Sequence, residues 1–129
     1  MAFQQMPLPQ TNILVGASQG AVDPKILSNV HKIAQSLIPP IPNWNITVLP
    51  EQQWNEWMKM NPSAKATDIT FSLMGANRTF IRQSFLKGKS DDQIRDQLAH
   101  EMGHLVSGSH DEDVANKTKA NYFKTKSWQ

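Results

Sequence analysis

The chain has 129 residues, with 13 Lys and Arg against 11 Asp and Glu, and it contains no cysteine. This length suits one domain, 1–129, that buries its own core, and the lack of cysteine excludes disulfide scaffolds, Cys-ligated zinc fingers and thiol catalysis. A net charge of +2 is too small to indicate nucleic-acid binding.

No apolar run approaches the roughly 20 residues that span a bilayer. The first residues also lack the basic and apolar regions of a signal peptide. We therefore expect no membrane association, no nucleic-acid partner, and a cytoplasmic protein unless another route exports it. Composition leaves the oligomeric state open.

The first part of the chain predicts an arm followed by a helix. Residues 1–22 are rich in Gln, Pro and Gly and predict a loosely structured arm with one short strand, Ile13–Val15. Asp23 followed by Pro24 is typical of a helix N-terminus. Apolar residues then recur at helical spacing as far as Leu37, and the prolines in 39–42 end the helix.

The middle of the chain predicts strands around one helix. The β-branched run Asn45–Leu49 predicts a strand, and 51–60 contains good helix formers. Apolar residues alternate over 67–73, and 79–86 is a second β-rich run. Turn residues separate these runs, so 67–86 predicts a β-hairpin.

The last part of the chain predicts two helices. Ser90 and Gln93 fit a capping box at the start of a helix over about 90–107, and Gly108 is typical of its C-terminal cap. Residues 111–123 predict a last helix. The whole order of elements predicts an α+β fold with a small mixed or antiparallel sheet.

The helix over 90–107 carries the sequence His100-Glu101-Met102-Gly103-His104. Residues four apart lie on the same helix face, so the two imidazoles could bind one ion from consecutive turns. Neutral imidazole suits Zn²⁺, and a carboxylate beside the first ligand could take a proton from a water held by the metal. The motif therefore predicts zinc ligands at His100 and His104 and a general base at Glu101.

A catalytic zinc site needs a third protein ligand and leaves its fourth position open. His110 follows His104 by six residues, and Gly108 lets the chain fold back between them. We expect His110 as the third ligand, with Asp113 or Glu112 as the alternative.

Gly103 is unusual because a glycine inside a helix costs about 1 kcal/mol relative to alanine. It could allow tight packing of the helix against the sheet, or it could leave room beside the metal.

These residues resemble the zincin-like metallopeptidases. The match rests on His100-Glu101-Met102-Gly103-His104 and on His110 at the spacing of the metzincin branch, although Ser107 stands where that branch has glycine. The resemblance implies a zincin-like fold with an N-terminal helix, the HExxH active-site helix and a C-terminal helix. It also implies that Thr79–Phe85 is an edge strand that lines the cleft and binds a peptide or protein substrate.

Two other families are similar over the same segment. Residues 110–116 resemble the acidic-x-x-Ala-Asn stretch of metallopeptidases that cleave phage-type repressors, where a carboxylate after the helix is the third ligand. The three histidines followed by acids resemble bacterial rRNA-maturation endoribonucleases, but that family lacks a glutamate after its first histidine. Glu101 therefore favours a zinc-dependent metallopeptidase, and an endoribonuclease-like hydrolase or a non-catalytic metal-binding protein is the alternative.

Overall fold

The computed structural model describes residues 12–17, 21–62 and 69–128. Over these residues the protein has an α+β fold with a mixed four-stranded sheet and five α-helices. In spatial order, the strands are β1 (Asn12–Gly16), β2 (Asn43–Leu49), β4 (Arg78–Arg82) and β3 (Thr70–Leu73). The first three run parallel, whereas β3 pairs antiparallel with β4 and forms one edge of the sheet.

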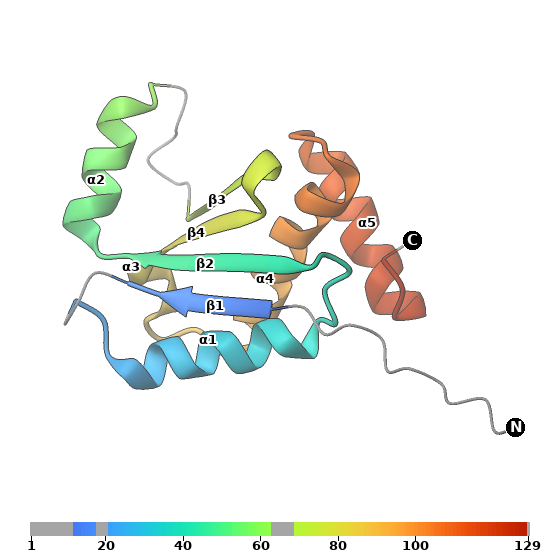
Figure 1. Cartoon of the computed structure of the whole chain (residues 1–129), viewed down its shortest axis with the longest axis horizontal. Coiled ribbons are helices and arrows are strands. Elements are labelled where there is room, and N and C mark those ends of the chain that lie inside the picture. The colour runs from blue at the N-terminus through green and yellow to red at the C-terminus, as the bar shows by residue number, and fades with distance from the viewer. Residues whose placement is uncertain (1–11, 18–20, 63–68, 129) are drawn as a thin grey trace, which may run out of the picture.

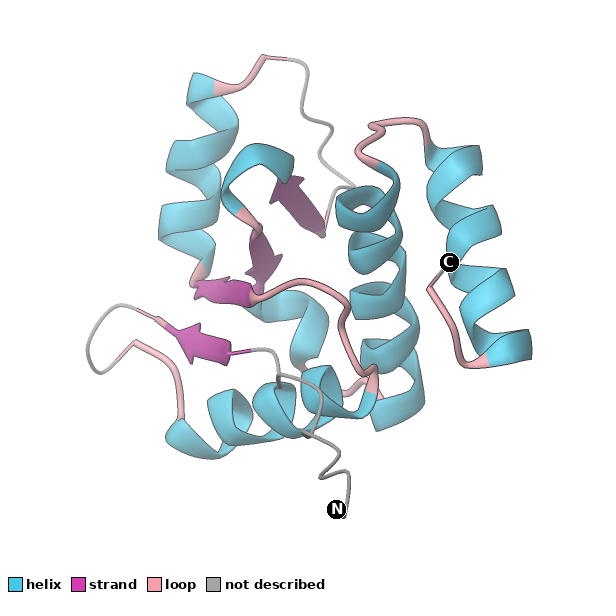
Figure 2. Ribbon diagram, turned by 45° about the vertical axis from the view of Figure 1, so that its right-hand side comes forward, coloured by secondary structure: helices cyan, strands magenta, loops and turns pink. Residues whose placement is uncertain are grey.

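The helices cover the sheet unequally, as Figures 1 and 2 show. They are α1 (Pro24–Ser36), α2 (Glu51–Met60), α3 (Gln83–Leu86), α4 (Asp91–Ser107) and α5 (Glu112–Thr125). Helices α1 and α4 pack on one face of the sheet, and α5 lies outside α4. None of the described helices is long and apolar enough to cross a membrane.

The core lies between the sheet and helices α1 and α4. Alternate side chains of β2 point inward, as the strand period of two requires. The buried residues from the sheet and the two helices include Trp44, Ile46, Val48, Ile81, Val30, Ile33, Leu98 and Met102. Because α4 buries one face in this core, it lies beside β3.

Several predicted elements are confirmed. Helix α2 has the predicted bounds, and β1 extends the expected strand by one residue at each end. Ser90 and Gln93 form the predicted capping box. Helix α5 begins after the N-cap residue Asp111 and ends at Thr125, two residues beyond the expected end. The expected start of the first hairpin strand, at Thr67, lies outside the described residues.

The strand predicted over 79–86 is too long. Strand β4 ends at Arg82, and residues 83–86 form the short helix α3 instead of continuing the strand. The cause is a residue far away in sequence, because the Glu51 carboxylate accepts hydrogen bonds from the hydroxyl and backbone N–H of Ser84 and from the Arg82 guanidinium. A carboxylate at the first turn stabilises a helix start.

The prediction that Thr79–Phe85 is an edge strand is wrong. Strand β4 lies between β2 and β3, so both of its sides are paired. The hairpin folds its later strand inward, because β4 pairs with β2 through the register Ile46 to Thr79. The edge strand beside α4 is therefore β3.

Candidate metal centre

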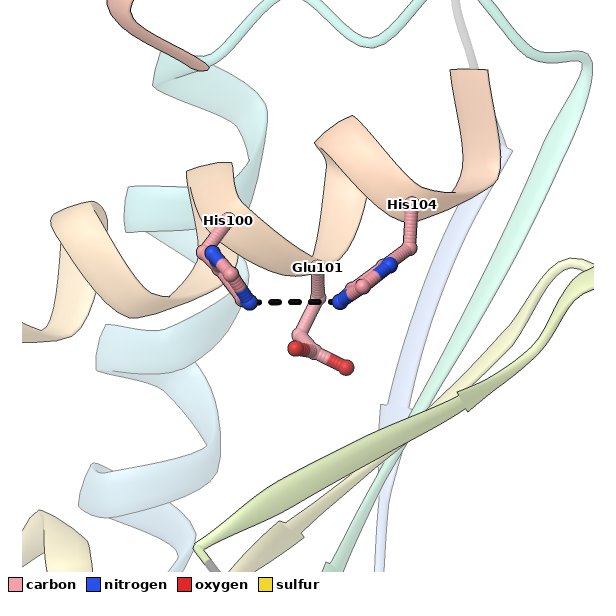
Figure 3. A group of neighbouring side chains, drawn as sticks. All are labelled: His100, Glu101 and His104. Atoms are coloured by element: carbon pink, nitrogen blue, oxygen red, sulfur yellow. Dashed lines mark hydrogen bonds between the residues drawn. The ribbon is translucent and has the colours of Figure 1, made fainter. Parts of the chain in front are cut away.

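Three side chains of α4 point to the same side of the helix, toward the sheet (Figure 3). The Nε2 atoms of His100 and His104 lie 3.2 Å apart. Two nitrogens bound tetrahedrally to one zinc ion, each at about 2.0–2.1 Å, would lie about 3.3 Å apart. Ligand atoms of His100, Glu101 and His104 all fall within 4.8 Å of one another.

The other nitrogen of each imidazole is held by a hydrogen bond. His104 Nδ1 lies 2.7 Å from the backbone oxygen of Ser109, and His100 Nδ1 lies 2.8 Å from Asn116 Oδ1. Carbonyl and amide oxygens can only accept, so both Nδ1 atoms donate. In the neutral imidazoles both Nε2 atoms therefore carry a lone pair, as metal ligation requires.

A carboxylate from α5 meets the two imidazoles. Glu112 Oε2 lies 2.6 Å from His100 Nε2, and Glu112 Oε1 lies 3.2 Å from His104 Nε2. Two lone pairs and a carboxylate repel one another unless a metal ion or a proton lies among them. Two imidazoles and one carboxylate form a donor set that zinc accepts, so these residues fit a metal site.

The close approach of α5 to α4 depends on Gly103. A Cβ atom at this position would lie 2.5 Å from the backbone oxygen of Ala115. Gly103 therefore serves tight helix packing, but its neighbour is α5 and not the sheet. The chain reverses between the two helices at Gly108, whose φ of 66° is left-handed and favours glycine.

Glu101 is buried, with 3% of its surface exposed. Its Oε1 accepts a hydrogen bond of 2.9 Å from the Ser72 hydroxyl. Burial raises the pKa of Glu101, and the Ser72 bond, the two nearby imidazoles and a hydrogen bond from the Thr70 side chain only partly oppose this effect. A carboxylate with a raised pKa is a stronger base than an ordinary glutamate.

A cleft of about 490 Å³ opens over these groups. Residues 70–73 of β3 form one wall, and Trp57 and Asn61 extend it from the end of α2. The indole of Trp57 stacks on Phe71 at 3.8 Å. Glu101, His104 and Glu112 line the opposite side. The cleft therefore joins the candidate metal ligands to the free edge of the sheet.

The three residues predicted as possible third ligands differ in what they contact. His110 also lines the cleft but is exposed, and within the described part of the chain it makes no hydrogen bond or ion pair. Asp113 lies in the first turn of α5, where its backbone N–H bonds to Asp111. Glu112 alone of the three contacts both imidazoles.

Among the site residues that sequence reasoning missed, Asn116 and Ser72 orient the candidate ligand His100 and the candidate base Glu101. Asn116 holds His100 and lies four residues after Glu112, so one face of α5 carries both. That spacing was visible in the sequence. Ser72 holds Glu101 from β3, and no local pattern links a strand serine to a helix glutamate 29 residues later.

Comparison with known proteins adds no family to this picture. No family model matches the sequence. No curated protein matches it either.

Proposed function

We propose that the protein is a zinc-dependent metallopeptidase in which His100, His104 and Glu112 hold the metal and Glu101 is the general base. The observation that carries the proposal is the convergence of two imidazole nitrogens, 3.2 Å apart, on one carboxylate beside a buried glutamate. Glu112 takes the place of His110 as the third ligand because it contacts both imidazoles. An edge strand beside the histidine-bearing helix supports the resemblance to zincin-like metallopeptidases.

The proposed reaction assigns separate roles to the zinc ion and to Glu101. When bound, zinc lowers the pKa of the attacking water and polarises the carbonyl of the scissile bond. The Glu101 carboxylate accepts a proton from that water and later passes it to the nitrogen of the leaving amine. Burial suits Glu101 to both steps, because its raised pKa makes it a better proton acceptor without removing its ability to donate again.

The peptide would bind along β3 and not along β4. Arg82 donates its backbone N–H to the Ile69 oxygen at 2.8 Å, which makes this a hydrogen-bonded pair of the hairpin. Such pairs alternate along an antiparallel ladder, so Thr70 and Ser72 fall in the non-hydrogen-bonded positions. Their main-chain groups point away from β4, toward the free edge, where an extended peptide can pair with them.

The Glu101→Gln variant tests the proposal. The glutamine side chain cannot accept a proton, so we expect the zinc-loaded variant to lose nearly all cleavage of a broad peptide library, at least about 100-fold. It should retain about one zinc per chain by mass spectrometry, since Glu101 is not among the three ligands. The His100→Ala/His104→Ala double variant should lose both the metal and the activity.

Other outcomes would overturn the proposal. Cleavage of RNA that depends on His110 and tolerates Glu101→Gln would favour an endoribonuclease-like hydrolase. A fully zinc-loaded protein that cleaves neither peptides nor RNA would be a metal-binding protein without turnover.

A further inference from the structure

A chain of hydrogen bonds runs from the core to Glu101. The Trp44 indole donates to Thr79 Oγ1 at 2.9 Å, Thr79 Oγ1 lies 2.9 Å from Ser72 Oγ, and Ser72 donates to Glu101 Oε1 at 2.9 Å. Trp44 and Thr79 are completely buried. This series of hydrogen bonds crosses the sheet from β2 through β4 to β3 before it reaches α4.

The direction of every bond in this chain is fixed by chemistry. An indole N–H can only donate and an ionised carboxylate can only accept. Each hydroxyl has one proton, so when Ser72 gives its proton to Glu101, the proton between Ser72 and Thr79 must come from Thr79. The Thr79 oxygen in turn accepts from Trp44. All three donors therefore point toward Glu101, and bonds aligned in this way strengthen one another.

Ser72 also occupies a special position on the edge strand. It faces Thr79 in a non-hydrogen-bonded pair, where side chains approach most closely, which explains the short contact between the two hydroxyls. The same geometry turns the main-chain groups of Ser72 toward the cleft. One residue thus presents its backbone to the free edge and its hydroxyl to the buried carboxylate.

We propose that Ser72 is a positioning residue that aligns Glu101 while its main chain sets the register of the peptide on β3. The inference rests on the proposed peptidase function. Thr79 and Trp44 orient the Ser72 hydroxyl, so the base is held at a fixed point relative to the strand that receives the substrate. The substrate class is accordingly an extended peptide segment that pairs at Ser72.

Kinetics of four variants test this role. In Ser72→Ala we expect kcat to fall about ten- to a hundredfold, because small displacements of a catalytic group have effects of this size. KM and zinc affinity should stay near wild type. Ser72→Thr retains the hydroxyl and should restore most of kcat, and Thr79→Val should lower kcat less than Ser72→Ala does. Thr47→Val is the matched control, since Thr47 lies next to Ile46, the partner of Thr79, and so faces the other side of the sheet.

Crystal structures of the zinc-loaded wild type and Ser72→Ala give a readout that does not depend on activity. We expect Glu101 Oε1 to leave its position when the serine donor is removed. An unchanged kcat in Ser72→Ala, or a Glu101 side chain that does not move, overturns the inference while the peptidase function stands. If the wild type cleaves nothing but Glu101 moves in the variant, the proposed function fails and the positioning role stands. If Ser72→Ala does not fold, Thr79→Val is compared with Thr47→Val instead. The same two measurements, kcat and the position of Glu101, then decide.

Discussion

The imidazoles of the candidate metal centre are oriented by two acceptors of different kinds. His104 donates to a main-chain oxygen in the turn after α4, whereas His100 donates to the side chain of Asn116 on α5. A main-chain acceptor survives most substitutions, but the acceptor for His100 depends on one residue. Outer partners of this type change metal affinity by about 10–100-fold when they are lost.

The identity of the third ligand can be tested at single residues. We expect Glu112→Gln to weaken zinc binding by more than the ~10–100-fold that an outer partner costs, because the charged donor itself is lost. His110→Gln should leave the affinity close to wild type. Competition titration with a chromogenic chelator measures both, and a larger loss for His110→Gln than for Glu112→Gln would restore His110 as the ligand.

Between elements, the contact of α4 with α5 determines whether Glu112 and Asn116 reach the imidazoles. Gly103 permits that contact, and its neighbour is a backbone oxygen that cannot rotate away. Two effects oppose each other when alanine replaces this glycine. Helix propensity favours alanine by about 1 kcal/mol, and overpacking costs about 1–3 kcal/mol. A contact of 2.5 Å with backbone makes the second effect the larger one.

We therefore expect Gly103→Ala to lower the free energy of unfolding by up to about 2 kcal/mol and to weaken zinc binding as α5 moves outward. Urea denaturation and the chelator titration measure the two effects. Gly75→Ala is the matched control, because a Cβ at that position meets nothing within 4 Å. Equal behaviour of the two variants would contradict the role assigned to Gly103.

A second contact between elements depends on pH. The Arg82 guanidinium, together with Ser84, lowers the pKa of Glu51 from 4.5 to about 2. A lowered pKa stabilises the fold above pH 4.5, and this contribution is lost as the pH falls from about 4.5 to about 2. The Glu51 side chain is 45% exposed, so solvent limits the contribution to about 1 kcal/mol or less.

Glu51→Gln should thus reduce the free energy of unfolding at pH 7 by up to about 1 kcal/mol, and the difference should vanish near pH 2. Glu56→Gln, on the same helix, is the control. A deficit in Glu51→Gln that persists unchanged at pH 2 would mean that the carboxylate charge is not its cause.

The elements that were predicted correctly have signals within a few residues of one another. The Ser90 capping box, the Asp23–Pro24 start and the 51–60 helix are examples. The errors concern partners far apart in sequence. The start of α3 depends on Glu51, and the inner position of β4 depends on its pairing with β2. The third ligand stays a prediction, because the spacing of His110 and Glu112 in the sequence does not show how α5 lies on α4.

For the whole molecule, zinc would be a link between α4 and α5, so binding should stabilise the folded state. A ligand at 100 times its Kd adds about 2.7 kcal/mol, which for a chain of this length raises Tm by about 10 °C. Calorimetry with and without zinc measures this shift. The His100→Ala/His104→Ala double variant should show no rise, and a similar rise in that variant would place the bound zinc elsewhere.

The position of α5 in the chain also determines when the candidate metal centre is complete. Both imidazoles and Glu101 lie before α5 in the sequence, whereas Glu112 and Asn116 are part of it. After α5, the Trp128 indole donates a hydrogen bond of 2.9 Å to the backbone oxygen of Leu37, just beyond the end of α1. On the ribosome, a nascent chain would expose the base and the histidines before the third donor emerges. The candidate centre would therefore be complete only after α5 docks.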